Sequence, residues 1–442
     1  MRLPTPFLCG ALLCSLTAQA RECPDAQPAA LTLPALLARG VCLDPRLAQQ
    51  GFELARTRGV VNEAAAASAW QVSLQAGPSA SLQQGSGSST RSATGSASLA
   101  VTRLLSDGGL TQFRTAQREH EAVAAQADLD AARQDSLRDL AGAWSDAREA
   151  QAVLLAARTS LDAARASDEI ARARFAAGSA TRVDVLSAAA SLAQAQREVV
   201  TSEVGWRRRQ VILAERLGWP DGTPIVLRGD ELAWLQSLAQ KVGDATPVLS
   251  PEQHPQLQAQ GQRVQARRAA LEVARAEEGA TVTVSGGTGP NITRSNAGLA
   301  PGYETTHRWN SQVALTWSMP LSDGGARRSR VAQNQAQVDS ALAQQQTLMR
   351  NLREALWQQW TAWRGSAAEV RAAQAALDAA AAAESAQRGR YQAGAGTLAD
   401  WIGAQSDLGA RMRQVASAEQ ARLRAAVGTL HSLGRLTLDF EP

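Results

Sequence analysis

The pentapeptide LSDGG occupies residues 105–109 and recurs unchanged at residues 321–325. Three further matches share this separation of 216 residues: 174–178 with 390–394, 183–186 with 399–402, and 217–218 with 433–434. Chance similarity would scatter the separations, so the matches predict an internal tandem duplication. One more pair, 44–47 and 254–257, is separated by 210 residues, which indicates loops of different length in the two halves.

The residues that follow each LSDGG turn have a helical pattern without a cluster of glycine or proline. We expect helices over 110–176 and 326–392, each on the order of 95 to 100 Å long. Each ends at a glycine suited to a C-cap, and a second helix of about 37 residues follows. The pattern predicts a pair of antiparallel coiled coils. Alanine on the buried stripe would allow close helix approach, or it simply raises helix propensity.

The residues before the first turn change from a helical period to an alternating one. A helix is expected from Pro45, with Asp44 as its cap. Apolar and polar residues then alternate over 72–83 and again over 93–101. This alternation predicts two strands with one apolar and one polar face, joined by a Gly/Ser/Thr loop.

The second half repeats this order. Val282 and Val284 belong to one predicted strand, a Gly/Pro/Asn loop is expected from Gly286 to Gly302, and residues 309–319 alternate as a second strand. We therefore expect two β-hairpins, at about 70–104 and about 280–320.

Aspartate and glycine define the predicted structural turns, because aspartate caps a helix start and glycine adopts conformations that other residues avoid. The turn residues are Asp107, Gly108, Gly109, Gly178, Asp323, Gly324, Gly325 and Gly394.

The N-terminus has the pattern of a secretory signal peptide. Arg2 precedes an apolar run over 7–16, and Ala18-Gln19-Ala20 forms a cleavage site, so residues 1–20 are expected to be removed. A membrane anchor is the alternative, but the run is too short to cross a bilayer. The mature chain would keep Cys23 and Cys42 in an oxidising compartment. We expect a disulfide between them, with two free thiols as the alternative.

Composition excludes several classes of protein. The chain is 45% apolar, which rules out intrinsic disorder, and its 45 basic and 41 acidic residues form no basic block, which argues against nucleic acid as a partner. The four histidines are isolated, so neither a metal site nor a cofactor is expected. No nucleophile elbow or phosphate-binding loop occurs, so we expect no catalytic residues and no enzyme.

The predicted strands have the length and the two-faced pattern that suit an outer membrane, with the polar face towards water. Four strands cannot close a transmembrane barrel, because the smallest have eight and an open sheet leaves edge amides unpaired in lipid. The protein must therefore oligomerise if it spans. Trp70, Tyr303, Trp309 and Trp317 lie near the strand ends, either as an aromatic girdle or as ordinary core packing.

The exported, duplicated order of helix, hairpin, Ser-Asp-Gly-Gly, long helix and Arg-Phe/Tyr-x-x-Gly resembles the TolC family of outer-membrane efflux and secretion channels. The resemblance implies a mainly α fold with transmembrane β structure: a trimeric α-helical tunnel of long antiparallel coiled coils plus a 12-stranded β-barrel with four strands per protomer. It also implies a channel in the outer membrane of a Gram-negative bacterium, with most of the chain in the periplasm. The implied partners are two further copies, outer-membrane lipid, a periplasmic adaptor and an inner-membrane ABC or RND-type pump.

The resemblance further implies a periplasmic gate at the helical tips. By position, Asp400 matches an acidic ring, Tyr391 a tyrosine tie, and Asp184 its acidic partner on the neighbouring coil. Gly396 and Gly403 stand where an arginine tie and a second acidic ring are expected, so Arg182 or Arg390 is predicted to contribute instead. The alternative for Asp184 and Asp400 is a solvated carboxylate in the first turn of a helix, stabilised by the helix dipole.

The predicted organisation consists of a signal peptide at 1–20, a first repeat at 21–220, a linker or equatorial segment at 221–250, a second repeat at 251–436 and a tail at 437–442. The expected function is the exit channel of a type I secretion or multidrug efflux system. A periplasmic coiled-coil adaptor is the alternative, although an adaptor would normally have one helical hairpin flanked by β-rich domains.

Overall fold

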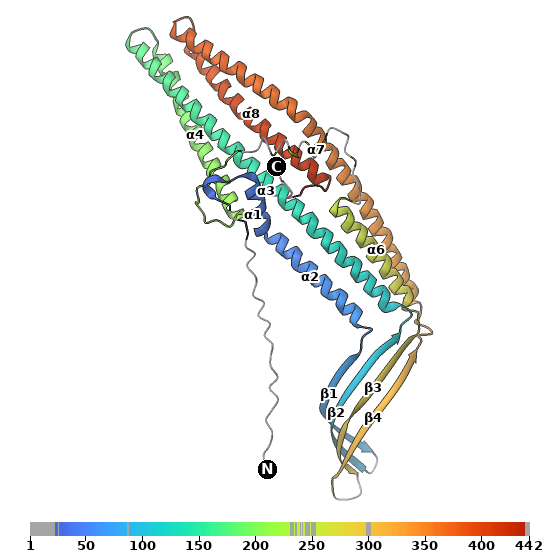
Figure 1. The fold of residues 1–442 in the computed structure, drawn as a ribbon. Coiled ribbons are helices and arrows are strands. Elements are labelled where there is room, and N and C mark those ends of the chain that lie inside the picture. Colours follow the sequence, from blue (N-terminus) through green and yellow to red (C-terminus); the bar gives the residue numbers. More distant parts are fainter. Residues whose placement is uncertain are drawn as a thin grey trace.

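The computed structural model describes residues 23–24, 26–85, 88–229, 253–297 and 302–437, with isolated positions between 230 and 252. The predicted signal peptide lies outside these residues, as do nearly half of the 221–250 linker and the last five residues of the predicted tail. The described chain is elongated, with paired helices at one end and a sheet of four strands at the other (Figure 1).

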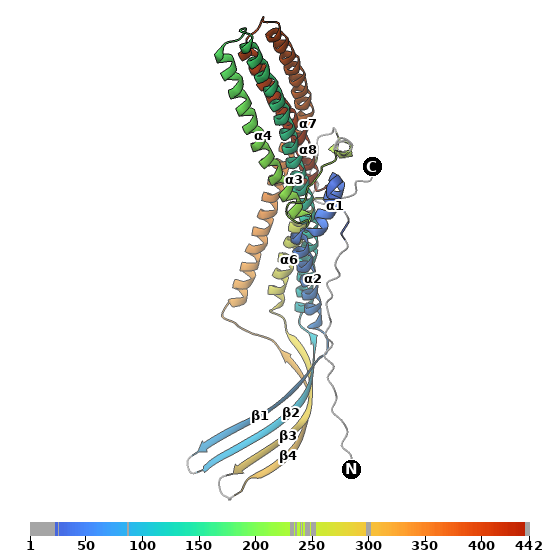
Figure 2. The same ribbon diagram turned by 90° about the vertical axis from the view of Figure 1, so that its left-hand side faces the viewer.

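The helices of the described chain fall into a short equatorial set and a long set. The short helices are α1 (Leu33–Leu43), α2 (Pro45–Ala66) and α6 (Pro255–Ala276). The long helices are α3 (Leu110–Ala176), α4 (Arg182–Arg216), α7 (Ala326–Gln392) and α8 (Leu398–Ser432). α3 pairs with α4 and α7 pairs with α8, so the two antiparallel helical hairpins stand side by side with their tips at the same end (Figures 1 and 2).

The two longest helices, α3 and α7, each begin at a turn that an aspartate holds. In the first half Asp107 accepts hydrogen bonds from the backbone amides of Gly109 and Thr111, at 3.1 and 2.7 Å. Asp323 makes the equivalent bonds to Gly325 and Arg327 in the second half, at 3.1 and 2.8 Å. Gly109 has a φ of 91°, a left-handed conformation that a side chain would strain. The repeated pentapeptide therefore forms the same sheet-to-helix corner twice.

The strands β1 (Gln71–Gly85), β2 (Ser88–Ser106), β3 (Thr281–Ala297) and β4 (Glu304–Ser318) form one antiparallel sheet in the order β1-β2-β3-β4. The two hairpins of the duplicated halves meet at the β2–β3 ladder, which pairs Thr90 with Ala297 and Arg103 with Val284. The outer edges of β1 and β4 have no strand beside them in the described chain.

The predicted loop from Gly286 to Gly302 is wrong, because β3 continues through Gly286 to Ala297 and pairs on both sides. The glycines and Pro290 of this segment are typical of a loop. The hydrogen bonds of a β-ladder, however, join backbone groups and require no particular side chain. At Gly289 an added Cβ would lie 1.9 Å from the carbonyl oxygen of Ala97 on β2. Glycine at this position allows the two hairpins to approach each other closely.

One face of the sheet is apolar and the other is polar along all four strands. The apolar face consists of residues of even number in β1 and β3 and of odd number in β2 and β4, as the pairing of Leu74 with Leu99 and of Val284 with Leu315 shows. Most of its large side chains are exposed; Leu74 and Val313 keep 74% and 85% of their surface. Trp70, Tyr303, Trp309 and Trp317 are likewise more than half exposed, so none of the four packs in this chain's core.

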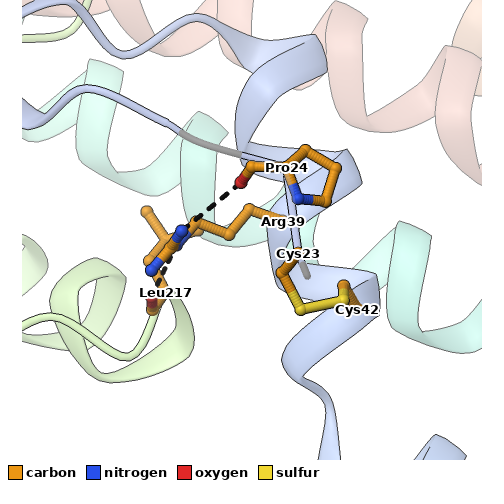
Figure 3. The surroundings of a disulfide bond; sticks show 5 residues. All are labelled: Cys23, Pro24, Arg39, Cys42 and Leu217. Atoms are coloured by element: carbon orange, nitrogen blue, oxygen red, sulfur yellow. Dashed lines mark hydrogen bonds between the residues drawn. A yellow bond between two sulfur atoms is a disulfide. The ribbon is translucent and has the colours of Figure 1, made fainter. Parts of the chain in front are cut away.

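The largest apolar core lies midway along the helices, where α1 packs against α3 (Figure 2). Trp144 of α3 and Leu36 of α1 are fully buried there. Figure 3 shows the disulfide between Cys23 and Cys42 at its edge, with a sequence separation of 19 residues. Beside it, Arg39 donates hydrogen bonds to the carbonyl oxygens of Leu217 and Pro24. These links hold the N-terminal segment against the end of α4.

None of the described helices combines the length and the apolarity that a bilayer-spanning helix needs.

His254, at the start of α6, is only 2% exposed, and neither of its ring nitrogens has a hydrogen-bond partner among the described residues. Burial chiefly, with a smaller contribution from the nearby His431 and opposed by Asp135, lowers the pKa of His254 to about 4. The Nε2–H of His431 itself donates a hydrogen bond to the Asp135 carboxylate at 2.7 Å. The native state therefore keeps the His254 imidazole neutral.

We expect the free energy of unfolding to fall as the pH falls from about 6.5 towards 4. In this range His254 binds a proton in the unfolded state but stays neutral in the native state. The full loss would be about 3 kcal/mol, at 1.36 kcal/mol for each unit between the two pKa values. Thermal unfolding followed by circular dichroism at several pH values measures it. His254→Leu should remove most of this pH dependence of stability, and the control His120→Gln should not change it. An unchanged pH dependence in His254→Leu would show that His254 is not its source.

Candidate functional site

The tips of the two helical hairpins are built alike. α3 ends in a turn at Gly178, with a φ of 73°, and α7 ends at Gly394, with a φ of 78°. The amide of Ser179 donates to the Arg174 carbonyl at 2.8 Å, and Ala395 donates to the Arg390 carbonyl at 2.9 Å. These bonds satisfy carbonyls that a helix end leaves unpaired. A threonine then caps the returning helix in each half.

Both predicted acidic residues take part in these caps. Thr181 donates to the Asp184 carboxylate from its amide and from its hydroxyl, each at 2.8 Å, while the Asp184 amide donates back at 3.2 Å. In the second half the Thr397 hydroxyl donates to Asp400 at 2.7 Å and accepts from its amide at 3.1 Å. The carboxylates thus sit in the first helical turn, where the helix dipole favours a negative charge. Asp400 is exposed and Asp184 is half-buried.

Tyr391 lies between the two hairpins and not on an outer surface. Only 4% of it is exposed, and its ring packs against Trp401 of α8 with centroids 5.5 Å apart. Ala171 of α3 and Ala188 of α4, both fully buried, complete the cluster with Leu398. The small alanines leave room for the two aromatic rings. The tips are therefore joined within one chain by an apolar contact.

Arg174 of α3 completes this contact from the other hairpin. Its guanidinium lies 4.7 Å from the centre of the Tyr391 ring and donates a hydrogen bond to the Tyr391 carbonyl. Such a cation over an aromatic face contributes about 0.5–2 kcal/mol, depending on burial. The Trp401 indole nitrogen also donates to Glu384 at 2.8 Å, which fixes the second ring.

The Tyr391 hydroxyl is buried and has no hydrogen-bond partner among the described residues. Burial raises the pKa of Tyr391; Arg174 opposes the shift and the negative charge of Asp184 adds to it. The structure therefore gives Tyr391 an apolar and cation–π contact within the chain, where the sequence predicted a tie to an acidic residue.

Arg182 and Arg390 are exposed, and neither forms an ion pair with another described residue. Gly396 is tightly surrounded, since an added Cβ would lie 3.1 Å from the Arg390 Cβ, whereas Gly403 has open space around it. Neither Arg174 nor Trp401 is among the residues that the sequence predicted for the gate. Arg174 could have been found, because it occupies the same place in the first motif as Arg390 in the second.

Polar contacts continue between the two hairpins below the tips. Arg413 of α8 pairs with Glu198 of α4 at 2.5 Å. Farther along α8, Arg424 pairs with Asp146 and Glu149 of α3, at 2.9 and 2.7 Å. These partly buried ion pairs fix the register of the hairpins, so the aromatic contact at the tips rests on an aligned pair of coils.

Comparison with known proteins gives a consistent result. The family model described as outer membrane efflux protein matches residues 38–218 and 247–435. Protein CyaE of Bordetella pertussis is 32% identical over 358 residues, 75% of this chain and 70% of that protein. The outer membrane efflux protein BepC of Brucella suis is 24% identical over 348 residues, 77% and 72% of the two chains. The solved structure of the outer-membrane channel OprN has the same fold, with a TM-score of 0.77, 21% identity and coverage of 91% and 89%.

We expect Tyr391→Phe to raise the free energy of unfolding by about 1 kcal/mol, because it removes a buried hydroxyl that lacks a partner. Tyr391→Ala should lower it by about 3 kcal/mol, since the ring leaves a cavity against Trp401. Denaturant unfolding of the purified protein in detergent measures both. A loss of stability in Tyr391→Phe would show that the hydroxyl has a partner.

Proposed function

The chain belongs to the outer membrane efflux protein family, and we propose that three copies form the exit channel of a type I secretion or multidrug efflux system. The family consists of outer-membrane channels, which are not enzymes. In the proposed arrangement the helices extend into the periplasm of a Gram-negative bacterium. We take the first repeat to run from residue 21 to residue 220 and the second repeat from residue 251 to residue 436.

The observation that supports the proposal best is the two-faced sheet. Its apolar face is exposed on every strand, and its polar face carries hydroxyl and amide groups such as those of Ser79, Thr94 and Gln312. A membrane-spanning barrel needs an apolar exterior and a polar interior. The sheet has both, in a strand register that keeps them separate except at the β-bulge between Leu104 and Ser106 next to the helices.

The open edges of the sheet support a trimer. A strand edge in lipid leaves amide and carbonyl groups unpaired, at a cost of several kcal/mol each. β4 of one copy can pair with β1 of the next, so three copies would close a barrel of 12 strands and leave no edge. The long helical hairpins of the three copies would then continue the barrel as a tunnel.

The tips are proposed as the periplasmic gate, with Asp400 lining the opening. Asp184, Arg182 and Arg390 are proposed to contribute charge there, and Tyr391 to hold the hairpins together through Arg174. Docking of a periplasmic adaptor that is joined to an inner-membrane ABC or RND-type pump would release this contact. The adaptor alternative for the chain itself is not supported, because the matched family is one of channels.

Single-channel recording in a planar bilayer tests the proposal, after the mass of the detergent-extracted species has been measured. A trimer with steady ohmic conductance steps is the expected result. A water-soluble species without conductance would overturn the channel and make the sheet a soluble hairpin pair.

Two adjacent substitutions test the direction of the sheet faces. Val313→Arg should prevent stable membrane assembly, because an arginine on the lipid side costs about 2–4 kcal/mol near the midplane. Gln312→Arg, one residue away on the polar face, should assemble normally. Trimer yield from isolated membranes measures the effect. A lower yield from Gln312→Arg than from Val313→Arg would mean that the faces are assigned the wrong way round, and equal yields would contradict a sheet with one face in lipid.

Arg174→Ala should raise the conductance of the resting channel about tenfold. The change removes the cation–π contact and a hydrogen bond from a charged donor, together worth roughly 1–3 kcal/mol. Arg165→Ala is the matched control, since Arg165 lies on the same helix in an exposed ion pair with Asp162. If both variants conduct like the unsubstituted protein, the contact does not restrain the gate.

A further inference from the structure

On β2 the apolar face of the sheet has an arginine at each end and none between. On β2, Arg91 and Arg103 lie on this face, and the five residues of the same face between them are uncharged: Ala93, Gly95, Ala97, Leu99 and Val101. The corresponding residues of β1 are also apolar, from Val72 to Leu82. The charges therefore bracket an uncharged band.

The length of this band matches the hydrocarbon core of a bilayer. Twelve residues separate the two arginines, or about 40 Å along a strand at roughly 3.3 Å per residue. A strand tilted by about 35–45° would reduce this to roughly 28–33 Å, against about 30 Å for the hydrocarbon core. Both arginines would then lie at the level of lipid headgroups.

The end of the sheet far from the helices carries a cluster that the other end lacks. Arg91 pairs in register with Leu82 and Asn296, and Arg294 lies one row inward on β3, on the same face. The Arg294 guanidinium lies 4.9 Å from the centre of the Tyr303 ring, and Tyr303 directly precedes β4 near the row of Arg91. This contact directs the Arg294 guanidinium towards the row of Tyr303 and Arg91 at the end of the sheet.

The two arginines and Tyr303 line a shallow hollow of about 550 Å³ together with Leu82 and Ala80. Its floor is apolar and its rim is cationic. Such a surface fits a molecule with acyl chains and an anionic headgroup, since arginine binds phosphate with two parallel hydrogen bonds.

No carboxylate neutralises the cluster. Glu304 is the only acidic residue of the four strands, and it pairs with Ser295 on the opposite, polar face. The sequence has no acidic residue in the connecting segments 86–87 and 298–303 either. Neither Arg91 nor Arg294 forms an ion pair with another described residue. These two charges lie on the apolar face beside the polar but uncharged Asn296 and Thr305, with His307 one row farther in, so an anionic group outside the chain would be favoured there.

We propose that Arg91 and Arg294 form a binding site for the phosphorylated headgroup of a membrane lipid in the leaflet farther from the helices. The proposal rests on the proposed function, because it needs the sheet to span a membrane. The acyl chains would cover the apolar residues below the hollow, and the phosphate would lie between the two guanidinium groups. Each arginine near an anionic lipid surface contributes roughly a fivefold gain in binding.

Native mass spectrometry of the detergent-solubilised oligomer tests the site, with bis-phosphorylated lipid A as the probe and its dephosphorylated form as the reference. The variant Arg91→Gln/Arg294→Gln should retain the phosphorylated lipid about 25-fold less well than the unsubstituted protein. Arg308→Gln is the control, since Arg308 is an arginine of the same sheet that pairs with Asn291 on the polar face, three residues along β3 from Arg294. It should retain the lipid fully.

Three results would overturn the lipid site: equal retention of the lipid by the double variant, equal retention of the dephosphorylated form, or an equal loss in Arg308→Gln. Displacement of the lipid by millimolar inorganic phosphate would also overturn it, in favour of a site for small anions. Conductance of the unsubstituted protein is recorded in parallel. If the protein conducts normally but does not retain the lipid, the lipid site is refuted and the proposed channel function is not.

Discussion

The unpaired backbone edges of a four-stranded sheet with an exposed apolar face constrain everything else in this molecule. The face is stable only in an apolar environment, and there the amide and carbonyl groups of β1 and β4 cannot be left without partners. One chain cannot satisfy both requirements. In the proposed channel the fold would be completed by an assembly that joins edge to edge, and the duplicated halves supply the two hairpins of each chain's sheet.

The sequence predicted most of the fold because its strongest signals are local. Asp107 and Asp323 set the helix starts through bonds to amides two and four residues away, and the glycines that follow need left-handed conformations. The long helices consequently occupy the ranges that the pattern predicted. β3 was missed in part because Gly289 is required by the close approach of β2, and a single strand's composition does not reveal its neighbour.

At the helical tips the internal duplication does not predict which side chains form the contact between the two hairpins. Arg174 and Arg390 occupy equivalent places in the two halves, and so do Phe175 and Tyr391. Only Arg174 reaches the other hairpin, because the halves pack against each other asymmetrically and bury Tyr391 while leaving Phe175 47% exposed. An internal repeat fixes the local conformation of both copies. It cannot show which copy's side chains lie at the contact between them.

This asymmetry bears on how the proposed gate would open. A tie between protomers couples their tips, so that opening one strains the next. The contact of Arg174 with Tyr391 lies within one chain, and Gly396 offers no side chain that could reach another. Each protomer would then contribute its own restraint, and the free energy of opening would be close to the sum of three independent contacts. Loosening one tip would widen the opening in part, without releasing the other two.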